Sequence, residues 1–487
     1  MVCFILNEPD FRILPGTEPI GGSGRGGPSR ALGLFAVSGR RRAPAACRHD
    51  RGSVLIIVLW IAFGLVSMTL YFGQSMLFEY RAADQNSAGV QAEQALEGAA
   101  RYLSYALTNS ASLGHMPETN YFRFEAVPVG EAAFWFIGRE DTDVTRDVPY
   151  YGLVDEASKL NLNTATIDLL EMLPRMTPEL AAAIIDWRDT DSTITVNGAE
   201  SETYARLDPP YLCKDALFDS IEELRLVRGT DMDLLLGEDT NMNGVLDPNE
   251  NDGNTSPPDD NRDGKLEPGL FEYLTVYSRE PNTGTNSNGI ARIDVSQAGS
   301  TNLTARLQEL FGQERATQIQ SRLIAATGFR SLLEFYLRSG MTPQEFGQIS
   351  DDLSVTNTAF TAGLVNVNTA SAAVLACIPG IGLDKATQVV AYRRSNQSAL
   401  TSVAWVLQIL DQASALQAAP YITTRSYQFS ADVVALGPHG RGYRRTLFIF
   451  DTSEGDPKII YRRDRSRLGW ALGADRLESW LEKKELQ

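Results

Sequence analysis

Residues 53–72 form an uninterrupted apolar run, SVLIIVLWIAFGLVSMTLYF, and this run constrains the chain more than any other feature. A helix needs about twenty apolar residues to cross the hydrocarbon core of a bilayer. No charged residue occurs between Gly52 and Phe78. A removed signal peptide is the alternative, but its apolar core is usually shorter and ends in an A-x-A-like site. The stretch from Ser75 to Ala83 offers no such site, so we predict a transmembrane helix over 53–75.

Charge changes sign across this run. Residues 1–52 contain eight Arg, no Lys and four acidic residues, a net charge of +4. The whole chain carries −17, so residues 53–487 carry −21. The positive-inside rule therefore keeps residues 1–52 in the cytoplasm and predicts export of the rest. The acidic balance also argues against a broad basic face for nucleic acid.

Composition excludes several kinds of catalytic or metal site. The chain has three His, each alone in sequence, and four Cys without a C-x-x-C pair. None of these residues has the sequence spacing that is typical of a zinc site. It contains no G-x-S-x-G, no P-loop and no H-E-x-x-H motif. We therefore expect no enzymatic activity. Cys213 and Cys377 lie in the part predicted to be exported and are 164 residues apart. We expect two isolated buried thiols, and a disulfide between them is the alternative.

The apolar run continues into a polar helical sequence. No Pro occurs between Pro44 and Pro117, and residues 79–107 are rich in Ala, Glu, Gln and Leu. Their small apolar residues recur every three or four positions, as one face of a helix requires. One helix is therefore expected from residue 53 to about residue 108. The alternative is two helices with a break near Gly73 or Gly89.

The junction at Arg51-Gly52, with the long helix carrying Glu93 and A-L-E-G-A, resembles the N-terminus of type IV prepilin-like proteins. That resemblance implies cleavage by prepilin peptidase after Gly52, leaving Ser53 as the mature, methylated N-terminus. Most such proteins have Glu at mature position five, where this chain has Ile57. Its absence is typical of the K-type minor pseudopilin of type II secretion. Two features depart from the pattern of the family: Ser53 stands where Phe or Met is commoner, and the leader has 52 residues where a short one is expected. A start site assigned too far upstream would explain the length of the leader.

Strand patterns occur early and late in the exported part. Phe122, Phe124 and Ala126 alternate with charged residues, and 132–138 reads as a second strand. Similar patterns return at 426–436, 443–450 and 458–463. We predict an α+β fold, in which these strands form one antiparallel sheet on the polar half of a pilin-like helix. Two unrelated β regions are the alternative.

Between these strands lies a helical region with an internal repeat. LNLNTATIDLLEMLPRMTPELAAAIIDWR at 160–188 parallels LVNVNTASAAVLACIPGIGLDKATQVVAYRR at 364–394. Each copy has N-x-N-T-A, an apolar helix, a Pro-containing turn and a second helix, which predicts two helix-hairpin-helix-like modules. Asn163 and Asn368 are expected at an N-cap or turn. The G-x-G hairpin at Gly380 and Gly382 could approach a phosphate of DNA, but a structural or partner-binding role is preferred.

Motifs at 150–230 extend the resemblance to the K-type pseudopilin over residues 51–470. They are DEASKLNLNTA, DWRDTDS, GAESETY, LDPPY and FDSIEELRLVRG, in that order. The resemblance implies a minor pseudopilin that caps the pseudopilus tip and helps initiate its assembly. It also implies a single-pass inner-membrane protein with its C-terminal domain in the periplasm. The implied partners are the I-type and J-type minor pseudopilins, the major pseudopilin and the prepilin peptidase, with no nucleic acid.

Two acidic loops between the modules have the spacing of EF-hand calcium loops. The first places oxygen ligands at Asp239, Asn241, Asn243, Val245 (through its carbonyl), Asp247 and Glu250, with Gly244 for the sharp turn. The second repeats the first nine positions at Asp259, Asn261, Asp263, Lys265 and Glu267, but Leu270 occupies position 12 and Glu272 could substitute for it. Proline-rich flanks favour calcium-ordered loops over paired helices. Solvated acidic linkers are the alternative.

These observations give one organisation and three functional hypotheses. The expected parts are a leader over 1–52, a transmembrane helix over 53–75, the polar half-helix and first strands over 76–151, a first module over 152–230, a calcium-binding loop region over 231–275, a second module over 276–420, and C-terminal strands and tail over 421–487. The preferred function is the minor pseudopilin. A membrane-anchored helix-hairpin-helix DNA receptor is the runner-up, and a calcium-dependent adhesin on a pilus-like anchor is the third.

Overall fold

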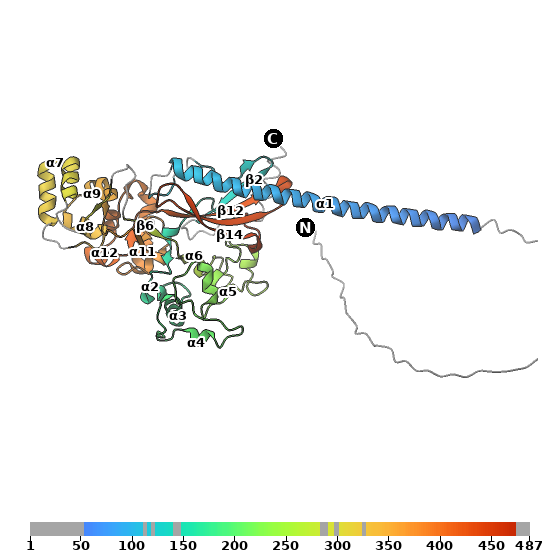
Figure 1. Ribbon diagram of the computed structural model, residues 1–487, viewed down its shortest axis with the longest axis horizontal. Coiled ribbons are helices and arrows are strands. Elements are labelled where there is room, and N and C mark those ends of the chain that lie inside the picture. The colour runs from blue at the N-terminus through green and yellow to red at the C-terminus, as the bar shows by residue number, and fades with distance from the viewer. Residues whose placement is uncertain are drawn as a thin grey trace, which may run out of the picture. The chain divides into compact units, whose positions relative to one another are not determined.

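A computed structural model of the chain describes residues 53–110, 114–117, 122–139, 148–282, 291–296, 301–323 and 328–473 (Figure 1). The expected leader and Gly52 lie outside the described residues, as does the side chain of Ser53. The chain divides into two units, Met1–Gly73 and Gln74–Gln487.

Helix α1 is continuous over Ser53–Ser110, so the alternative of a break near Gly73 or Gly89 is wrong. Its most apolar window has a mean hydropathy of 2.4 and no buried residue. The large apolar side chains from Val54 to Tyr80 are exposed. Exposure of so many apolar side chains to water would be unfavourable, so this half of α1 has the composition of a single-pass membrane anchor.

Early and late segments of the chain contribute strands to one antiparallel sheet, as predicted. The strands are β1 (Val127–Val129), β2 (Ala132–Ile137), β12 (Gln428–Leu436), β13 (Arg444–Asp451) and β14 (Lys458–Asp464), hydrogen-bonded in that order. Central strand β12 pairs with β2 on one side and β13 on the other. The short strand β3 (Val154–Asp155) also pairs with β12. The alternative of two unrelated β regions is therefore wrong.

The strand expected from the alternation at Phe122 to Ala126 is wrong. These residues precede the sheet, and β1 begins only at Val127. Ala126 has a φ of +49°, a left-handed conformation that an extended strand does not accommodate. The carbonyl of Phe124 nevertheless accepts a hydrogen bond from the N–H of Phe136 at 2.9 Å. The alternation reflects burial of the two Phe side chains beside the sheet rather than a strand of their own.

The polar half of α1 packs on one face of this sheet (Figure 1). The shared core contains Ala92, Ala95, Leu96, Ala99 and Leu103 of the helix with Phe134, Phe136, Val433, Phe448 and Phe450 of the strands. The intervening strand residues, such as Trp135 and Val434, point to a second small core with Ala471 and Leu472. Alternation along each strand thus divides the side chains between two faces.

Close approach of helix and sheet depends on small residues. A Cβ added to Gly442, which has a φ of +69°, would lie 2.4 Å from Gly89 N and from the carbonyl carbon of Ala88. Gly437 would likewise place a Cβ 2.4 Å from the carbonyl oxygen of Ala88. Glycine therefore lets the turn between β12 and β13 contact the helix backbone directly.

The long insertion leaves the sheet after β3 and returns before β12, as predicted. Its helices are α2 (Ile167–Glu171), α3 (Pro178–Arg188), α4 (Ser201–Tyr204), α5 (Met232–Leu236), α6 (Leu270–Tyr273), α7 (Thr301–Leu323), α8 (Leu332–Ser339), α9 (Pro343–Ile349), α10 (Ala372–Ala376), α11 (Gly382–Ser395) and α12 (Gln412–Ala418). Gly312, with a φ of +77°, divides α7 into two helical segments.

Short strand pairs hold the insertion together. They are β4 (Leu160–Asn161) with β5 (Leu274–Thr275), β6 (Arg279–Pro281) with β9 (Phe360–Ala362), β7 (Ile293–Asp294) with β8 (Leu353–Ser354), and β10 (Val365–Asn366) with β11 (Ile422–Thr423). Three pairs are parallel, and the β6–β9 pair is antiparallel. Each parallel pair joins segments distant in sequence, so the insertion folds by long-range contacts.

Candidate functional site

The six residues expected to ligate calcium in the first acidic loop lie together in one hydrogen-bonded turn. Asp239 accepts hydrogen bonds from the backbone N–H groups of Asn243 and Gly244, both at 2.9 Å. Glu250 accepts from the N–H of Thr240 through Oε1 and from the N–H of Asp247 through Oε2, each at 3.1 Å. The first and last ligand positions therefore fix the same turn, with Gly244 in the left-handed conformation at a φ of +71°.

Two carboxylates of this loop are buried. Asp239 is 3% exposed and Glu250 is 1% exposed. Burial, followed by repulsion from Asp239, raises the pKa of Glu250 to about 8. Burial also raises the pKa of Asp239, although Arg139 opposes that shift. Each buried carboxyl group thus makes ionisation of the other less favourable. A bound cation would offset this electrostatic cost.

Amide side chains complete the loop around Asp247. Asn241 Nδ2 donates to Asp247 Oδ2 at 2.6 Å, and Asn243 Nδ2 donates to the same oxygen at 3.1 Å. Asn243 Oδ1 accepts from the N–H of Val245 at 2.7 Å. The side chains at positions 1, 3, 5, 9 and 12 therefore form one connected group, as the spacing requires.

Two arginines connect this loop to the sheet. Arg445 on β13 donates to the carbonyl oxygens of Asn241 and Met242, the latter at 2.6 Å. Arg139, just after β2, donates to the same Met242 oxygen at 3.0 Å and lies 3.6 Å from Asp239 Oδ2. The loop conformation is therefore held by groups more than 100 residues away in sequence.

The second acidic loop differs from the first in exposure. Its expected ligands Asp259, Asn261, Asp263, Lys265 and Glu267 are all exposed. Leu270, at position 12, is fully buried in the hydrophobic core. Glu272, the expected substitute, pairs with Arg139 at 2.9 Å, and Glu267 pairs with Arg175 at 3.3 Å. The described contacts give the second loop no buried carboxylate comparable to Glu250.

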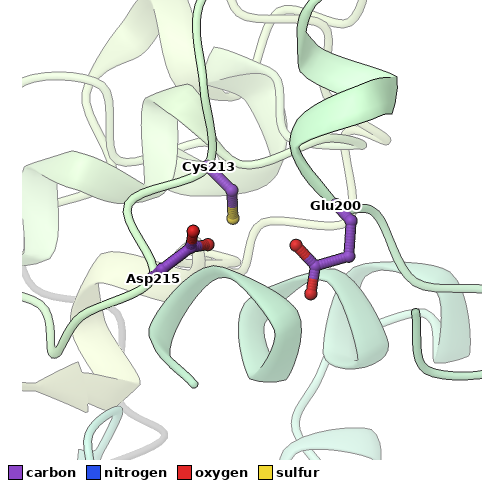
Figure 2. A group of neighbouring side chains, drawn as sticks. All are labelled: Glu200, Cys213 and Asp215. Atoms are coloured by element: carbon purple, nitrogen blue, oxygen red, sulfur yellow. The ribbon is translucent and has the colours of Figure 1, made fainter. Parts of the chain in front are cut away.

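Both cysteines of the described residues are free thiols, as expected. Cys213 and Cys377 are buried and unpaired with each other. Burial raises the pKa of each thiol to about 12. Cys213 differs from Cys377 in its surroundings, because the carboxylates of Glu200 and Asp215 lie beside its sulfur (Figure 2). The sequence predicted no such cluster, since α4 and a loop separate Glu200 from Cys213.

The repeated modules have matching internal contacts. In each copy the side chain of the first Asn caps a turn: Asn161 Oδ1 accepts from the N–H of Asn163, and Asn366 Oδ1 accepts from that of Asn368, both at 2.9 Å. Asn163 and Asn368 therefore lie in the turn, while Thr166 and Ser371 are the N-cap residues. In each copy an arginine of the second helix, Arg188 or Arg393, donates back to a carbonyl of the same turn.

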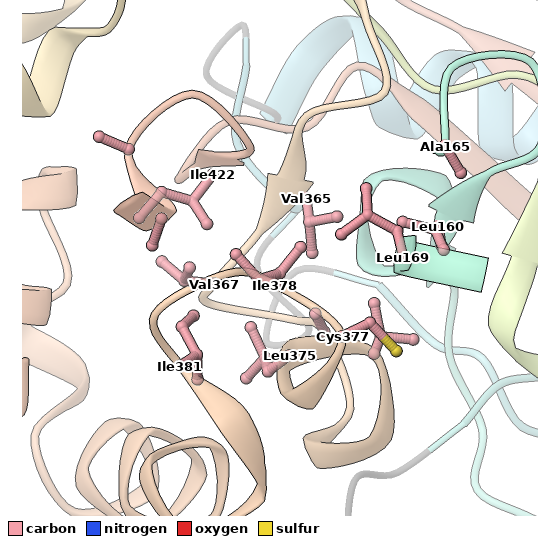
Figure 3. Close-up of a cluster of buried hydrophobic side chains, with 14 of the residues drawn as sticks. Leu160, Ala165, Leu169, Val365, Val367, Leu375, Cys377, Ile378, Ile381 and Ile422 are labelled. Atoms are coloured by element: carbon pink, nitrogen blue, oxygen red, sulfur yellow. The ribbon is translucent and has the colours of Figure 1, made fainter. Parts of the chain in front are cut away.

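The two modules share one hydrophobic core. Figure 3 shows Leu160 and Leu169 of the first copy beside Val365 of the second. The same cluster includes Leu375 and Ile378 of the second copy. The two copies therefore pack against each other as parts of one structure. This packing favours the structural role expected from the sequence.

Three of the basic and glycine residues of the second hairpin make contacts within the protein. Lys385 Nζ donates to Ser414 Oγ at 2.5 Å and pairs with Asp411 at 3.1 Å. A Cβ on Gly380 would lie 2.4 Å from the carbonyl oxygen of Ser414, so helix α12 covers this turn. Arg393 is only 6% exposed. These contacts disfavour the DNA-receptor hypothesis, because Lys385, Gly380 and Arg393 are engaged within the protein.

The most important residues that sequence reasoning missed are Arg139, Asp432 and Arg445. Asp432 and Arg445 lie in strands and are nearly or fully buried. Burial opposes ionisation of Asp432, but Arg445 and Arg465 outweigh it and hold the pKa of Asp432 below its ordinary value. The sequence does place Asp432 inside an otherwise apolar strand pattern, which indicates a buried charge. It does not indicate which residue pairs with that charge.

Two family models match parts of the insertion. Residues 155–236 match the family model of type II secretion system (T2SS) protein K, and residues 361–422 match that of the helix-hairpin-helix motif. A solved structure of the GspK-GspI-GspJ complex from the enterotoxigenic Escherichia coli Type 2 Secretion System is similar with 13% identity and a TM-score of 0.34. That match covers 76% of this chain and 96% of the solved chain.

Two curated relatives carry the same description as the first family model. Type II secretion system protein K of Pectobacterium carotovorum subsp. carotovorum is 43% identical over 56 residues, which are 12% of this chain and 17% of the relative. The protein of that name from Klebsiella pneumoniae is 32% identical over 95 residues, 20% of this chain and 27% of the relative. The chain thus aligns with less than a third of either relative. One family model and two curated relatives thus show that parts of this chain are similar to type II secretion system protein K.

Proposed function

We propose that this chain is a minor pseudopilin of a type II secretion system, an assembly subunit rather than an enzyme. The observation that carries the proposal is the form of α1: its apolar part is exposed and its Ala-rich part packs on an antiparallel sheet. One helix can thereby bind lipid or neighbouring helices and also hold a soluble domain. The match of residues 155–236 to protein K supports the same conclusion.

The insertion favours a position at the tip of the pseudopilus. It occupies the chain between β3 and β12, and its modules share one large core. A filament in which α1 packs among its neighbours leaves little room for such an insertion on every subunit. At the tip, no subunit stacks above it. Ile57, where most prepilin-like proteins have Glu, also suits a first subunit, because no preceding N-terminus requires a carboxylate partner.

The proposed partners follow from this position. They are the I-type and J-type minor pseudopilins, the major pseudopilin below them, and the prepilin peptidase that removes the leader. The inner membrane holds the apolar half of α1, and the acidic body lies in the periplasm according to the positive-inside rule.

Co-purification tests this assignment. The full chain, tagged at its C-terminus and extracted in detergent, should bind the I-type and J-type minor pseudopilins together in a stoichiometric complex. Each minor pseudopilin expressed alone with the chain, and the major pseudopilin alone, serve as controls. Failure to form a complex with both, from cells in which all three accumulate, would contradict the proposed function.

Processing of the N-terminus provides an independent test. Mass spectrometry of the mature chain should find Ser53 as its first residue, with or without N-methylation. A Gly52→Val variant should retain the leader, because the prepilin resemblance gives Gly as the residue before the cut. Gly64→Val, within the apolar part of α1, is the matched control and should be cleaved normally. A mature chain that starts elsewhere would contradict the prepilin assignment.

We further propose that the first acidic loop binds calcium. The support is one turn that brings together an oxygen donor set and buries two of its carboxylates, those of Asp239 and Glu250. The donors are the side chains of Asp239, Asn241, Asn243, Asp247 and Glu250, with the carbonyl of Val245. Oxygen ligands of this kind suit Ca²⁺. The second loop, at Asp259, Asn261, Asp263, Lys265 and Glu267, is exposed and lacks a position-12 carboxylate, so we propose weaker binding there.

A further inference from the structure

Residues 291–355 lie between the two repeated modules, and neither family model covers them. Their strands β7 and β8 pair in parallel, as β4 pairs with β5 in the first module and β10 with β11 in the second. The sequence I-D-V-S at 293–296 stands where the two modules have L-N-L-N and V-N-V-N. This segment therefore begins and ends as the modules do.

The turn after β7 repeats the hydrogen bonds of the modules. Asp294 Oδ1 accepts from the N–H of Ser296 at 2.8 Å, as the first Asn of each module accepts from the residue two places later. The N–H of Val295 donates to the carbonyl of Ser354 on β8 at 2.8 Å. The corresponding bonds in the modules run from Leu162 N–H to Thr275 and from Val367 N–H to Thr423. Asp offers the same side-chain oxygen as Asn, so the substitution keeps the turn.

Helix α7 supplies both helices of a hairpin. Gly312 separates them at a φ of +77°, and Gly382 begins the second helix of the second module at a φ of +66°. The residues that follow read R-A-T-Q-I at 315–319 and K-A-T-Q-V at 385–389. Two positions of this helix are buried in α3, α7 and α11 alike: Ala181 and Ile184, Ala316 and Ile319, Ala386 and Val389. An α7 interrupted at one glycine therefore has the form of a helix-hairpin-helix unit.

The helices that close each unit are capped in the same way. Glu334 Oε2 accepts from the N–H of Arg330 at 2.9 Å, and Glu223 Oε1 accepts from the N–H of Asp219 at 2.8 Å. The N-cap residues of these helices are Ser220, Ser331 and Ser402. The next helices have the N-cap residues Asp231, Thr342 and Asp411, each accepting from the N–H three residues later. Four residues after these caps lie the buried Leu235, Phe346 and Ala415. Corresponding residues thus have corresponding roles from β7 to β8.

The segment packs on the second module through equivalent elements (Figure 1). Helix α8 contacts the 3₁₀ helix η7 (Val403–Gln408), and these two elements follow equivalent serine caps. Helix α9 contacts η7, and reciprocally α12 of the second module contacts α8. The approach is close, because a Cβ added to Gly347 of α9 would lie 3.2 Å from Thr401 Oγ1. Two units that present the same elements to each other form a two-fold, isologous type of interface.

We infer that residues 291–355 are a third helix-hairpin-helix module, and that it occupies the partner-binding face of the second module. Trp405 and Val406 of η7 are buried in the second module. In the first module the corresponding 3₁₀ helix, η3 (Ile221–Leu226), instead meets the sheet, where the hydroxyl of Tyr461 on β14 donates to Glu222 at 3.0 Å. The partner that the η7 face fits is therefore another module of the same fold, and the chain itself supplies it.

Hydrogen exchange of the full chain in detergent tests this pairing, because segments that open cooperatively exchange together. Phe346→Ala leaves a cavity in the third module and should speed amide exchange at least tenfold in α7, α8 and α9. The same variant should speed exchange at least tenfold in η7 and α12 of the second module. Exchange in η3 and α5 of the first module should change less than twofold. Mass spectrometry of peptides from each element measures these rates.

Leu235→Ala is the matched control, since Leu235 has in α5 the position that Phe346 has in α9. It should speed exchange in the first module and leave α8, α9, η7 and α12 within twofold. The reciprocal variant Val406→Ala, in η7, should speed exchange in α8 and α9. Phe346→Leu replaces Phe346→Ala where circular dichroism shows that the latter fails to fold. Faster exchange confined to α7, α8 and α9 in the Phe346 variants, or equally faster exchange in η3 and α5, would overturn the proposal.

Discussion

Arg445 on β13 donates two hydrogen bonds to the carboxylate of Asp432 on the neighbouring strand β12, from Nε to Oδ1 at 2.9 Å and from Nη2 to Oδ2 at 2.7 Å. Arg465 donates to Asp432 Oδ2 at 2.8 Å. The same Arg445 guanidinium also reaches the carbonyls of the first acidic loop. Arg445 therefore takes part in a buried ion pair within the sheet and also connects the sheet to the insertion.

Arg445→Met should lower the free energy of unfolding by about 3–5 kcal/mol, because it leaves Asp432 buried beside one arginine instead of two and removes the donors to the loop. Arg206→Ala is the matched control. Arg206 is 80% exposed in its pair with Glu202, so its loss should cost less than about 1 kcal/mol. Denaturant unfolding of the full chain in detergent, followed by circular dichroism, measures both. Equal effects of the two substitutions would contradict the structural role of Arg445.

Calcium should raise the melting temperature, and Asp239→Ala should remove most of the increase. A ligand at about 100 times its Kd stabilises the fold by about 2.7 kcal/mol. Asp239 lies in the buried loop, whereas Asp259 occupies the same position in the exposed one, so Asp259→Ala should keep most of the gain. Thermal unfolding with calcium and with chelator provides the comparison. The same melting temperature in both would show that the loop is not a calcium site.

Asp155 should make stability depend on pH. Burial raises its pKa to about 6, although Ser426 and Thr369 oppose this shift by hydrogen bonding to the carboxylate. Between pH 4 and pH 6 the unfolded chain loses this proton while the folded chain keeps it. The free energy of unfolding should therefore fall as pH rises through that window, by about 3 kcal/mol in total, and level off above it.

Asp155→Asn should abolish this part of the pH dependence, since the amide does not titrate. The relevant measurement is the difference in unfolding free energy between the two proteins from pH 4 to pH 7, which cancels the contributions of other groups. Curves that remain parallel across this range would contradict the raised pKa of Asp155.

Arg393→Ala should destabilise the second module. Arg393 Nη1 donates to the carbonyl of Val367 at 3.0 Å, and a buried hydrogen bond from a charged group is worth about 1.5–3 kcal/mol. The neighbouring Arg394 is exposed, so Arg394→Ala should cost less. Limited proteolysis near α11, with denaturant unfolding, distinguishes the two. A larger effect of Arg394→Ala would mean that the exposed arginine stabilises the module.

The sequence by itself determined the local features of this protein. The apolar run at 53–72 and the Ala-rich continuation predicted α1, because an uninterrupted helical pattern depends only on neighbouring residues. The paired N-x-N-T-A segments predicted the repeated turns, and the acidic spacing at 239–250 predicted which residues share a loop. Local hydrogen bonds such as that from Asn163 N–H to Asn161 Oδ1 form these features.

Only the tertiary structure decided how the distant parts meet. Arg445 and Asn241 are 204 residues apart, and Asp155 and Ser426 are 271 residues apart, so no periodic pattern could pair them. The left-handed backbone at Ala126 overrode the alternation of the preceding residues, which made the predicted first strand wrong. The grouping of Glu200 with Cys213 and Asp215 was likewise invisible in sequence. Burial and charge compensation depend on which segments pack together, and that packing is a property of the whole fold.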